Sequence, residues 1–364
     1  MKNTFGQSVA VTLFGESHGA EIGVVIDGIT PGIRVKEEDI AAALDRRRPS
    51  GRISTTRAET DKFRIVSGVM NGRTTGTPIC ILIPNTDTRS KDYSRMASLP
   101  RPGHADFSAE CKYHGFQDFR GGGHFSGRLT APLVAAGAIA CSALSEKGIT
   151  IGTHIAELGG VKDRKFDVYA QDFALIRGSS FPVLDDTAAQ EMRKAAEKAA
   201  CEGDSVGGVL ETAICGVPCG VGEPWFDTLE GVLAHAMYSI PAVKGVEFGD
   251  GFALSAMRGS VSNDAYIMEY GHVRTATNHA GGICGGITTG MPITFRLAVK
   301  PTPSIRKPQR TINLGTMKGE ELTVEGRHDP TVVHRAAPVA DALSALVILD
   351  LLSSRFGTDW FLPA

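Results

Sequence analysis

Histidines in glycine- and proline-rich turns are the residues of this chain whose types and spacing best suit chemistry. His18 follows Ser17 in "GESHG" at residues 15–19. Neighbouring side chains rarely point at each other, and the G-x-S-x-G pattern of a nucleophile elbow is absent, so a Ser–His triad is weakly indicated. A histidine presented in a cleft is one interpretation, and a solvated turn histidine is the other.

A second histidine stands in "RPGHAD" at 101–106, which joins Arg101, His104 and Asp106. An ordinary Pro-Gly turn is the alternative. With His114 and His124, the same long segment carries three histidines. Their spacing from one another and from cysteines is not that of a zinc site, so the sequence predicts no metal.

Arginines gather in "DRRRPSGR" at 45–52, which contains Arg46, Arg47, Arg48 and Arg52 around a proline turn. Guanidinium groups bind phosphates and carboxylates through paired hydrogen bonds. A run of like charges is also typical of a solvated face. Because Arg57 and three hydroxyls follow in "ISTTR", the density of donors favours a small ligand with two or three negative charges.

The stretch "FRGGGHFSGR" at 119–128 has the glycine content of a phosphate loop but not its pattern. It lacks the Lys-Ser/Thr pair of a P-loop, and Ser126 stands where the last glycine of G-x-G-x-x-G belongs. Free N–H groups before a helix would still favour an anion there. Further along, "GRHDP" sets Asp329 near Arg327, as a salt bridge or as a base whose pKa is tuned by charge.

Periodicity predicts the elements that must position these turns. Alternation predicts strands at 8–14, 22–29, 207–218 and 291–301, the first two as a hairpin around "GESHG". Helices are predicted at 36–47, 126–148, 186–205 (capped by Asp186 or Thr187) and 338–357. Without regular βαβ alternation, this order favours an α+β fold with antiparallel sheets. We expect a single domain over 1–364.

Residues 84–123 are long, polar and without clear periodicity, yet they contain five aromatic side chains. Long irregular segments are functional or disordered, and disordered segments tend to lack aromatic residues. We therefore expect an ordered active-site loop.

Composition narrows the class of protein. The net charge of −2 argues against a nucleic-acid binder, which usually has a basic excess. Seven cysteines without a CxxC pair predict reduced thiols in a cytoplasmic protein. The run "APLVAAGAIACSAL" is too short for a membrane span, and the N-terminus has no signal-peptide core, so no membrane association is expected.

Nine segments, taken in order from residue 15 to 330, resemble one family, chorismate synthase. They are "GESHG", "DRRRP", "NTDTRSKDYS", "RPGHAD", "FRGGGHFSGR", "VKGVEFGDGF", "NHAGGICGG", "KPTPSI" and "GRHDP". The resemblance implies the last step of the shikimate pathway, in which 5-enolpyruvylshikimate 3-phosphate loses phosphate and a ring proton by 1,4-anti elimination to give chorismate. It also implies a need for reduced FMN, a β-α-β sandwich with helices between two antiparallel sheets, and a homotetramer.

The resemblance also implies residue roles. His18 would serve the departing phosphate, His104 the reduced flavin, and Asp329 the removal of the ring proton, with Ser17 and Ser126 orienting both ligands. Arg48 and Arg128 would bind substrate, although Arg128 could instead be a structural anchor. Residues implied around FMN are His124, Phe125, Ser126, Pro241, Ala242, Gly285, Lys300, Pro301, Thr302, Pro303, Ser304 and Arg327. Arg47 and Arg52 match positions linked to NADPH.

Some alternatives stay open at this stage. NADPH or a separate flavin reductase would supply the electrons for FMN. The chain departs from many bacterial members at His124–Phe125, Pro241 and Cys284. A flavin reductase that consumes NAD(P)H stoichiometrically is a rival enzyme class, and an anion- or RNA-binding module built on "DRRRPSGR" is the non-enzymatic rival.

Overall fold

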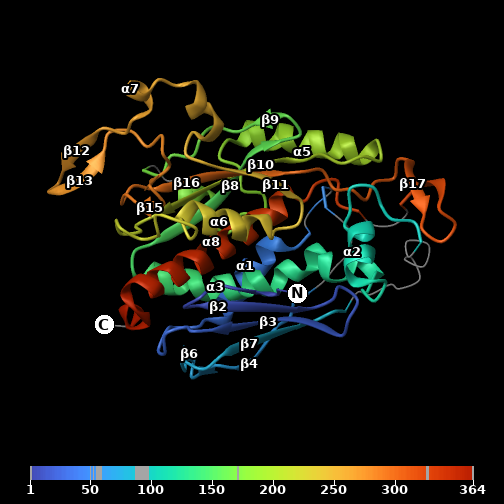
Figure 1. Cartoon of the computed structure of the whole chain (residues 1–364), viewed down its shortest axis with the longest axis horizontal. Helices are drawn as coiled ribbons and strands as arrows, with labels where there is room; N and C mark the ends of the chain where they lie inside the picture. The colour runs from blue at the N-terminus through green and yellow to red at the C-terminus, as the bar shows by residue number, and fades with distance from the viewer. Residues whose placement is uncertain are drawn as a thin grey trace.

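A computed structural model describes residues 2–49, 51, 53–54, 60–86, 98–169, 172–324 and 328–362. Two five-stranded antiparallel sheets enclose a layer of helices (Figure 1). The first sheet has the order β1 (Thr4–Phe5), β2 (Ala10–Gly15), β3 (Glu21–Asp27), β7 (Ile79–Pro84), β4 (Arg64–Ser67). The second has the order β11 (Val243–Phe248), β16 (Ile293–Val299), β10 (Gly208–Cys215), β8 (Thr150–Leu158), β9 (Val161–Lys162). The predicted α+β sandwich is confirmed.

Three helices form most of the middle layer: α1 (Glu37–Arg47), α3 (Thr130–Glu146) and α8 (Val333–Phe356). Apolar faces on both sides explain this position, because nearly every side chain of α8 is buried. α6 (Leu229–Tyr238) packs against α8 and β11, while α5 (Asp186–Cys201) covers the outer face of the second sheet (Figure 1). The helix prediction for 126–148 is confirmed by α3.

The remaining described elements are short. The helices are α2 (Asp106–Tyr113), α4 (Asp172–Ile176), α7 (Gly259–Ser262) and the 3₁₀ turns η2 (Arg120–Phe125), η3 (Gly127–Leu129), η4 (Gly251–Ala256) and η5 (Thr358–Phe361). The two-stranded ribbons are β5 (Val69–Met70) with β6 (Arg73–Thr74), β12 (Tyr266–Glu269) with β13 (His272–Thr275), β14 (Ile283–Cys284) with β15 (Ile287–Thr288), and β17 (Gln309–Asn313) with β18 (Lys318–Leu322).

The strand predictions hold where one face is buried. β2 and β3 pair around the turn at 15–19, with Gly15 opposite Ile22. In β16, Ile293, Phe295, Leu297 and Val299 are buried, and the side chains between them are not. This alternation follows from the period of two in a strand.

Three predictions were wrong in detail. Within the expected irregular segment 84–123, residues 106–113 form α2, and 87–97 lie outside the described residues. Asp185, rather than Asp186 or Thr187, caps α5 by accepting a hydrogen bond from the Ala188 N–H. α8 begins at Val333, ahead of Pro338, so this proline lies inside the helix instead of opening it.

Two helices pass a length and composition test for crossing a membrane, the stretch Gly127–Glu146 and α8. The first is longer than the apolar run that the sequence indicated. Of their most apolar windows, 67% and 94% of the residues are buried inside the fold. Both serve as core helices of the sandwich.

Candidate active site

The glycine run at 121–123 lies between two histidines. A Cβ built on Gly121 would stand 2.1 Å from His18 Cε1, and one on Gly122 would stand 3.4 Å from His104 Cε1. The φ of Gly121 is +59°, a conformation that other residues rarely adopt. The backbone at 121–122 therefore separates the two imidazoles at close contact, and Gly121 leaves no room for a side chain.

Hydrogen bonds hold this loop against the "GESHG" turn. The Ser17 N–H donates to the Gly123 carbonyl at 3.1 Å, and His124 Nδ1 donates to the Gly15 carbonyl at 2.8 Å. The turn itself is fixed by the pairing of β2 and β3, which it connects. Ser17 and His18 are buried at this junction.

Asp106 orients the second histidine. His104 Nδ1 donates to Asp106 Oδ1 at 2.6 Å, and Arg101 donates to both carboxylate oxygens at 2.7 and 2.8 Å. Burial would raise the pKa of Asp106, but the hydrogen bonds from Arg101 and His104 outweigh it and hold this pKa below its ordinary value. With Nδ1–H donated to the carboxylate, His104 Nε2 is the nitrogen that remains for a ligand.

The segment from Lys300 to Ser304 packs onto the same turn. Arg101 Nη1 donates to Ser304 Oγ at 3.1 Å, and Lys300 Nζ donates to the Gly103 carbonyl. The Lys300 N–H donates to the Ala242 carbonyl at 2.9 Å. Pro241, Ala242 and "KPTPS" are thus brought to the side of the site where His104 lies.

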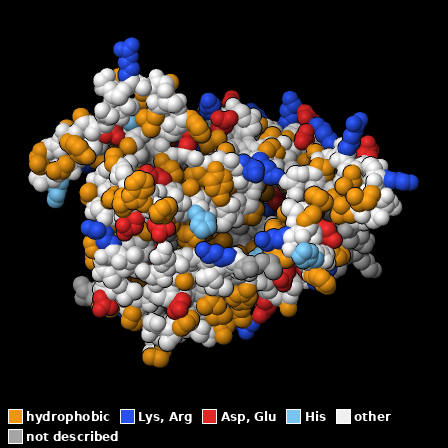
Figure 2. Space-filling view, viewed as in Figure 1, with side chains coloured by type: hydrophobic (Ala, Val, Ile, Leu, Met, Phe, Trp, Pro, Cys, Tyr) orange, Lys and Arg blue, Asp and Glu red, His pale blue; other side chains and the backbone are white. Residues whose placement is uncertain are grey.

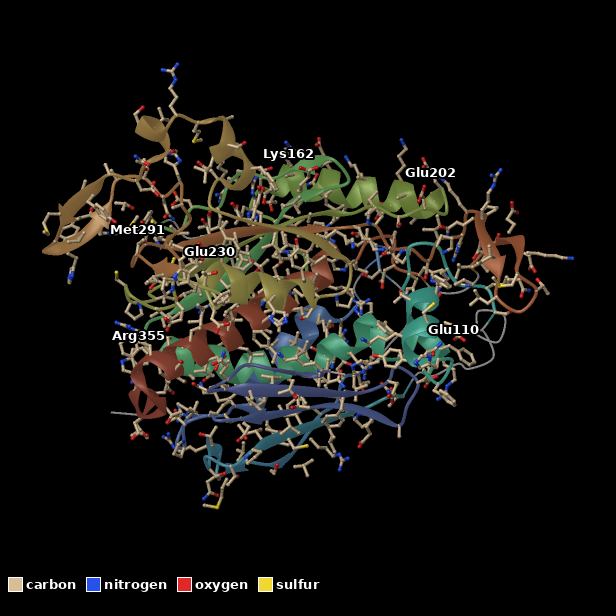
Figure 3. The ribbon with its side chains drawn as sticks, in the orientation of Figure 1. Glu110, Lys162, Glu202, Glu230, Met291 and Arg355 are labelled. Atoms are coloured by element: carbon tan, nitrogen blue, oxygen red, sulfur yellow. The ribbon has the colours of Figure 1, made fainter. Side chains whose placement is uncertain are left out.

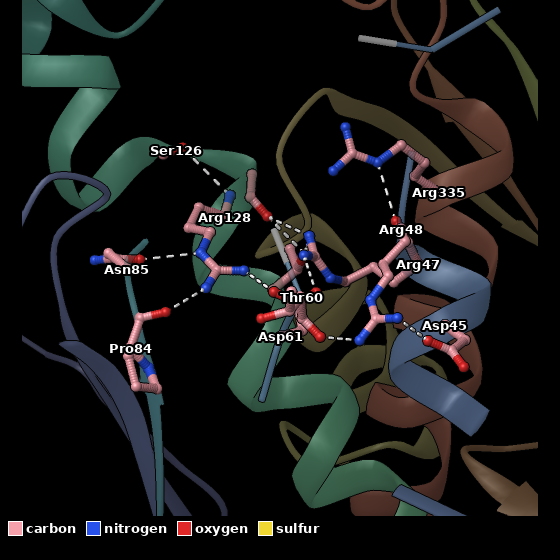
Figure 4. Close-up of polar contacts among 12 residues, drawn as sticks. Asp45, Arg47, Arg48, Thr60, Asp61, Pro84, Asn85, Ser126, Arg128 and Arg335 are labelled. Carbon is pink, nitrogen blue, oxygen red and sulfur yellow. Dashed lines mark hydrogen bonds and ion pairs between the residues drawn. The ribbon is translucent and has the colours of Figure 1, made fainter. Parts of the chain in front are cut away.

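Arginines form a buried cluster beside the loop (Figure 4). Asp61 binds Arg47 Nη2 through Oδ2 at 2.8 Å and Arg128 Nη1 through Oδ1. Arg128 also donates to Asn85 Oδ1 at 3.0 Å and to the Pro84 carbonyl at 3.1 Å. Ser126 Oγ accepts the Arg128 N–H at 3.2 Å. Arg48 is more exposed and pairs with Asp45 and the Thr60 carbonyl.

The start of α8 completes the cluster. Arg335 Nη1 pairs with Asp329 Oδ2 at 2.7 Å, and Arg335 Nε donates to the Arg47 carbonyl at 3.0 Å. The first residues of α3 and α8 therefore both lie here, and their positive dipole ends favour negative charge. Figure 2 shows Lys and Arg side chains around a hollow beside the segment that contains α2. The arrangement suits a ligand with several negative charges.

Buried hydroxyls fit a polar cofactor. Three buried hydroxyls of the described residues have no hydrogen-bond partner: Ser344 Oγ, inside the core helix α8, and Ser17 Oγ and Thr302 Oγ1, which lie on segments of the site. Such groups are uncommon inside a protein unless a ligand or water satisfies them. Thr302 also lies two residues from the charged Lys300, so its hydroxyl and that of Ser17 suit a ligand with polar edges.

Comparison with known proteins decides the family. The family model described as chorismate synthase matches residues 9–353. The chain belongs to the chorismate synthase family. It is 48% identical over 354 residues to the chorismate synthase of Dehalococcoides mccartyi, with 96% of each chain covered. It is 47% identical over 356 residues to that of Methanosarcina mazei, with 97% of each covered.

A solved structure agrees with this assignment. The fold matches a crystal structure of chorismate synthase with a TM-score of 0.76 at 28% identity, covering 97% of this chain and 93% of the other. Chorismate synthase is a lyase that catalyses the last step of the shikimate pathway, towards the aromatic amino acids. The activity that the resemblance implied is therefore confirmed for this chain.

The roles of single residues in this chorismate synthase stay predictions, and the structure locates most of them. It brings together the predicted residues around the turn, the loop and the helix starts: Ser17, His18, Arg47, Arg48, His104, His124, Phe125, Ser126, Arg128, Pro241, Ala242, Lys300, Pro301, Thr302, Pro303, Ser304 and Asp329. Arg52 and Arg327 lie outside the described residues.

Gly285 lies apart from this set. Gly285 belongs to the β14–β15 ribbon, in which the Thr288 carbonyl accepts a hydrogen bond from the Gly220 N–H. Gly220 in turn lies against Arg355, in the last turn of α8. The site lies at the first turn of α8, whose 24 residues extend about 36 Å. In Figure 3, Arg355 and Met291 accordingly lie at the opposite end of the molecule from Glu110 of α2.

Sequence reasoning missed Asp61, Asn85, Arg335 and His334. His334 is buried, and its Nε2 lies 2.8 Å from Ser54 Oγ, which ties residue 54 to α8. Burial and the nearby Arg335 and Arg193 lower the pKa of His334 to about 3, so it stays neutral. Asn85 opens the segment "NTDTRSKDYS", so that motif could have pointed to it, whereas the other three stand in no recognisable motif and only their three-dimensional partners reveal them.

We expect Gly121→Ala to lower kcat by at least about tenfold, because the new methyl group would displace His18. Steady-state chorismate formation measures this. Gly127→Ala is the matched control, since a Cβ there meets nothing within 4 Å. Equal rates for the two variants would contradict the close packing of the loop on His18.

Asp106 should stabilise the fold in a pH-dependent way. Because its folded pKa lies below its ordinary value of 3.8, its contribution is present above that pH and is lost as the pH falls further. Urea unfolding of wild type and Asp106→Asn should give a constant difference in unfolding free energy from neutral pH to about pH 5. The difference should shrink below about pH 4; one that grows on acidification would be incompatible with a depressed pKa.

Proposed function

We propose that this chorismate synthase works with reduced FMN bound against the glycine loop that separates His18 from His104. The observation that carries the proposal is the glycine loop held between the two imidazoles, next to a buried arginine cluster. A flat cofactor can approach glycine backbone closely. The unmatched hydroxyls of Ser17, beside Gly121, and of Thr302, on the segment that packs against the His104 turn, support polar ligand contacts on both sides of the loop.

In this proposal different residues of the chain act on the phosphate, on the ring proton and on the negative charges of the substrate. His18 protonates or electrostatically stabilises the phosphate as its bond to the ring carbon breaks, and Asp329 assists removal of the ring proton. Arg48, with Arg327 and Arg128, neutralises the carboxylates and phosphate of 5-enolpyruvylshikimate 3-phosphate. Reduced FMN, when bound, supplies transient electron density and is not consumed. His104, held by Asp106, stabilises its reduced form.

Arg128 has a second role in this scheme. Its Nε and both terminal nitrogens donate to protein acceptors. It therefore acts on the substrate mainly through its charge and through the position of the Ser126 turn. Arg47 is similarly engaged by Asp61, and its Nε has no partner among the described residues.

The decisive experiment is an anaerobic assay with 5-enolpyruvylshikimate 3-phosphate. One arm contains chemically reduced FMN, and the other contains oxidised FMN and NADPH. Chorismate formed in the first arm without stoichiometric flavin oxidation supports the proposal, because the elimination has no net redox change. His104→Ala is the control, since it should slow turnover greatly while FMN still binds.

The two arms also identify the reductant. Chorismate in the NADPH arm means that the enzyme reduces its own flavin, as Arg47 and Arg52 would allow. Activity in the first arm alone requires a separate flavin reductase. If chorismate forms equally without any flavin, the cofactor proposal is wrong.

We also propose that the protein is a cytoplasmic homotetramer. All seven cysteines, each within the described residues, are unpaired thiols, as expected in a reducing compartment. The β12–β13 ribbon projects from the second sheet and exposes Tyr266, Met268, Tyr270 and Val273 (Figures 1 and 2). A two-stranded hairpin is marginally stable alone, so a neighbouring subunit would stabilise it.

We expect Met268→Lys to reduce the assembled mass, because a charge would be buried between subunits. Light scattering after gel filtration measures the mass. Met70→Lys is the matched control, since this methionine is similarly exposed on the β5–β6 ribbon. A monomeric wild type would refute the tetramer, and an unchanged mass for Met268→Lys would refute the role of the ribbon.

A further inference from the structure

Asp61 is a buried carboxylate at the centre of the arginine cluster. Its side chain is 0% exposed, and those of Arg47 and Arg128 are 3% exposed. Each carboxylate oxygen accepts from a different guanidinium group (Figure 4). Burial would raise its pKa, but the charges of the two arginines lower it, so Asp61 is an anion that both arginines share.

One carboxylate oxygen of Asp61 is connected through hydrogen bonds to the turn that contains His18. Arg128, bound to Oδ1, donates through Nε to Asn85 Oδ1. Asn85 Nδ2 in turn donates to the carbonyls of Glu16 and Gly19, at 3.0 and 2.9 Å. Those two carbonyls flank Ser17 and His18 in the chain.

The other carboxylate oxygen of Asp61 is connected through Arg47 and Arg335 to Asp329. Arg47, bound to Oδ2, accepts through its own carbonyl from Arg335 Nε. Arg335 Nη1 binds Asp329 Oδ2. A continuous series of polar contacts therefore joins the His18 turn, on the first sheet, to Asp329, ahead of α8, and Asp61 is its midpoint.

The charge of Asp61 is required for this arrangement. Without it, two buried guanidinium groups would lie side by side with no anion between them, and they would repel each other. The backbone of Asp61 has a φ of +48°, a strained conformation for a residue with a Cβ. Such strain persists only where surrounding contacts impose it, and here the two arginines do so.

We propose that Asp61 is a positioning residue that sets the distance between the phosphate side of the reaction, at His18, and the ring-proton side, at Asp329. The inference rests on the roles given above to His18 and Asp329. Asp61 touches neither substrate nor cofactor; it acts through Arg47 and Arg128. A 1,4-elimination needs both groups to act on one substrate molecule, so a change in their separation affects the chemical step.

The test is Asp61→Asn, assayed for kcat, KM and melting temperature with saturating reduced FMN. We expect kcat to fall about 10- to 100-fold, with a smaller change in the KM for 5-enolpyruvylshikimate 3-phosphate. Asp341→Asn is the matched control. Asp341 is also buried, and it pairs with Arg46, the neighbour of Arg47 on α1, at 2.9 Å.

A purely structural role predicts that both variants lose melting temperature and keep the wild-type kcat well below the transition. The positioning role predicts a loss of kcat in Asp61→Asn alone. Equal kcat values for the two variants would overturn the proposal. Wild-type enzyme that forms no chorismate would instead overturn the proposed function, so the two failures are distinguishable.

A second variant serves if Asp61→Asn does not fold. Asn85→Ala cuts the contacts between Arg128 and the His18 turn but leaves the buried charges paired. It should keep a melting temperature near that of the wild type and still lower kcat by about tenfold. A wild-type kcat in Asn85→Ala would also overturn the proposal.

Discussion

Close contact between α3 and α8 is the constraint on which the rest of the structure depends. A Cβ on Gly137 would stand only 2.2 Å from that of Ala342, so the two helices touch backbone to backbone at this point. The two sheets pack on opposite sides of this layer. Because α3 and α8 both begin at the site, their packing decides where Arg128 and Arg335 stand.

The cost of burying a charge is the second constraint. Two buried aspartates, each paired with one of two neighbouring arginines of α1, show how burial and nearby positive charge compete in setting the pKa of a carboxyl group. Asp341 has a single arginine, Arg46, and burial raises its pKa. Asp61 has two, and their charges lower its pKa in spite of burial. The second guanidinium at Asp61 adds a positive charge that lowers the carboxyl pKa against the effect of burial, and Asp341 has no such second charge beside it.

Elements with one buried face could be predicted from the sequence, and elements without such a face could not. β16 alternates because every second side chain enters the core. α2 has only Ala109 buried, so it offers no apolar period to detect. The first turn of α8 was missed because a proline usually opens a helix, whereas Pro338 lies inside this one. Motifs contain most of the candidate site residues that the fold brings together, but Asp61 stands in "AETDKF", which matches no motif, and its partners are distant in sequence.

Because the arginine cluster is buried, a change in ionic strength affects it less than it affects charges at the surface. Mobile ions screen charges at the surface, such as the Lys307–Asp204 pair, far more than charges inside a protein. Under the proposal that the hollow binds the polyanionic substrate, added salt weakens the long-range attraction that brings the substrate there and slows its association. The spacing of Arg47 and Arg128 around Asp61 is shielded from the same ions. Ionic strength thus acts on the arrival of the substrate, while the geometry that receives it stays constant.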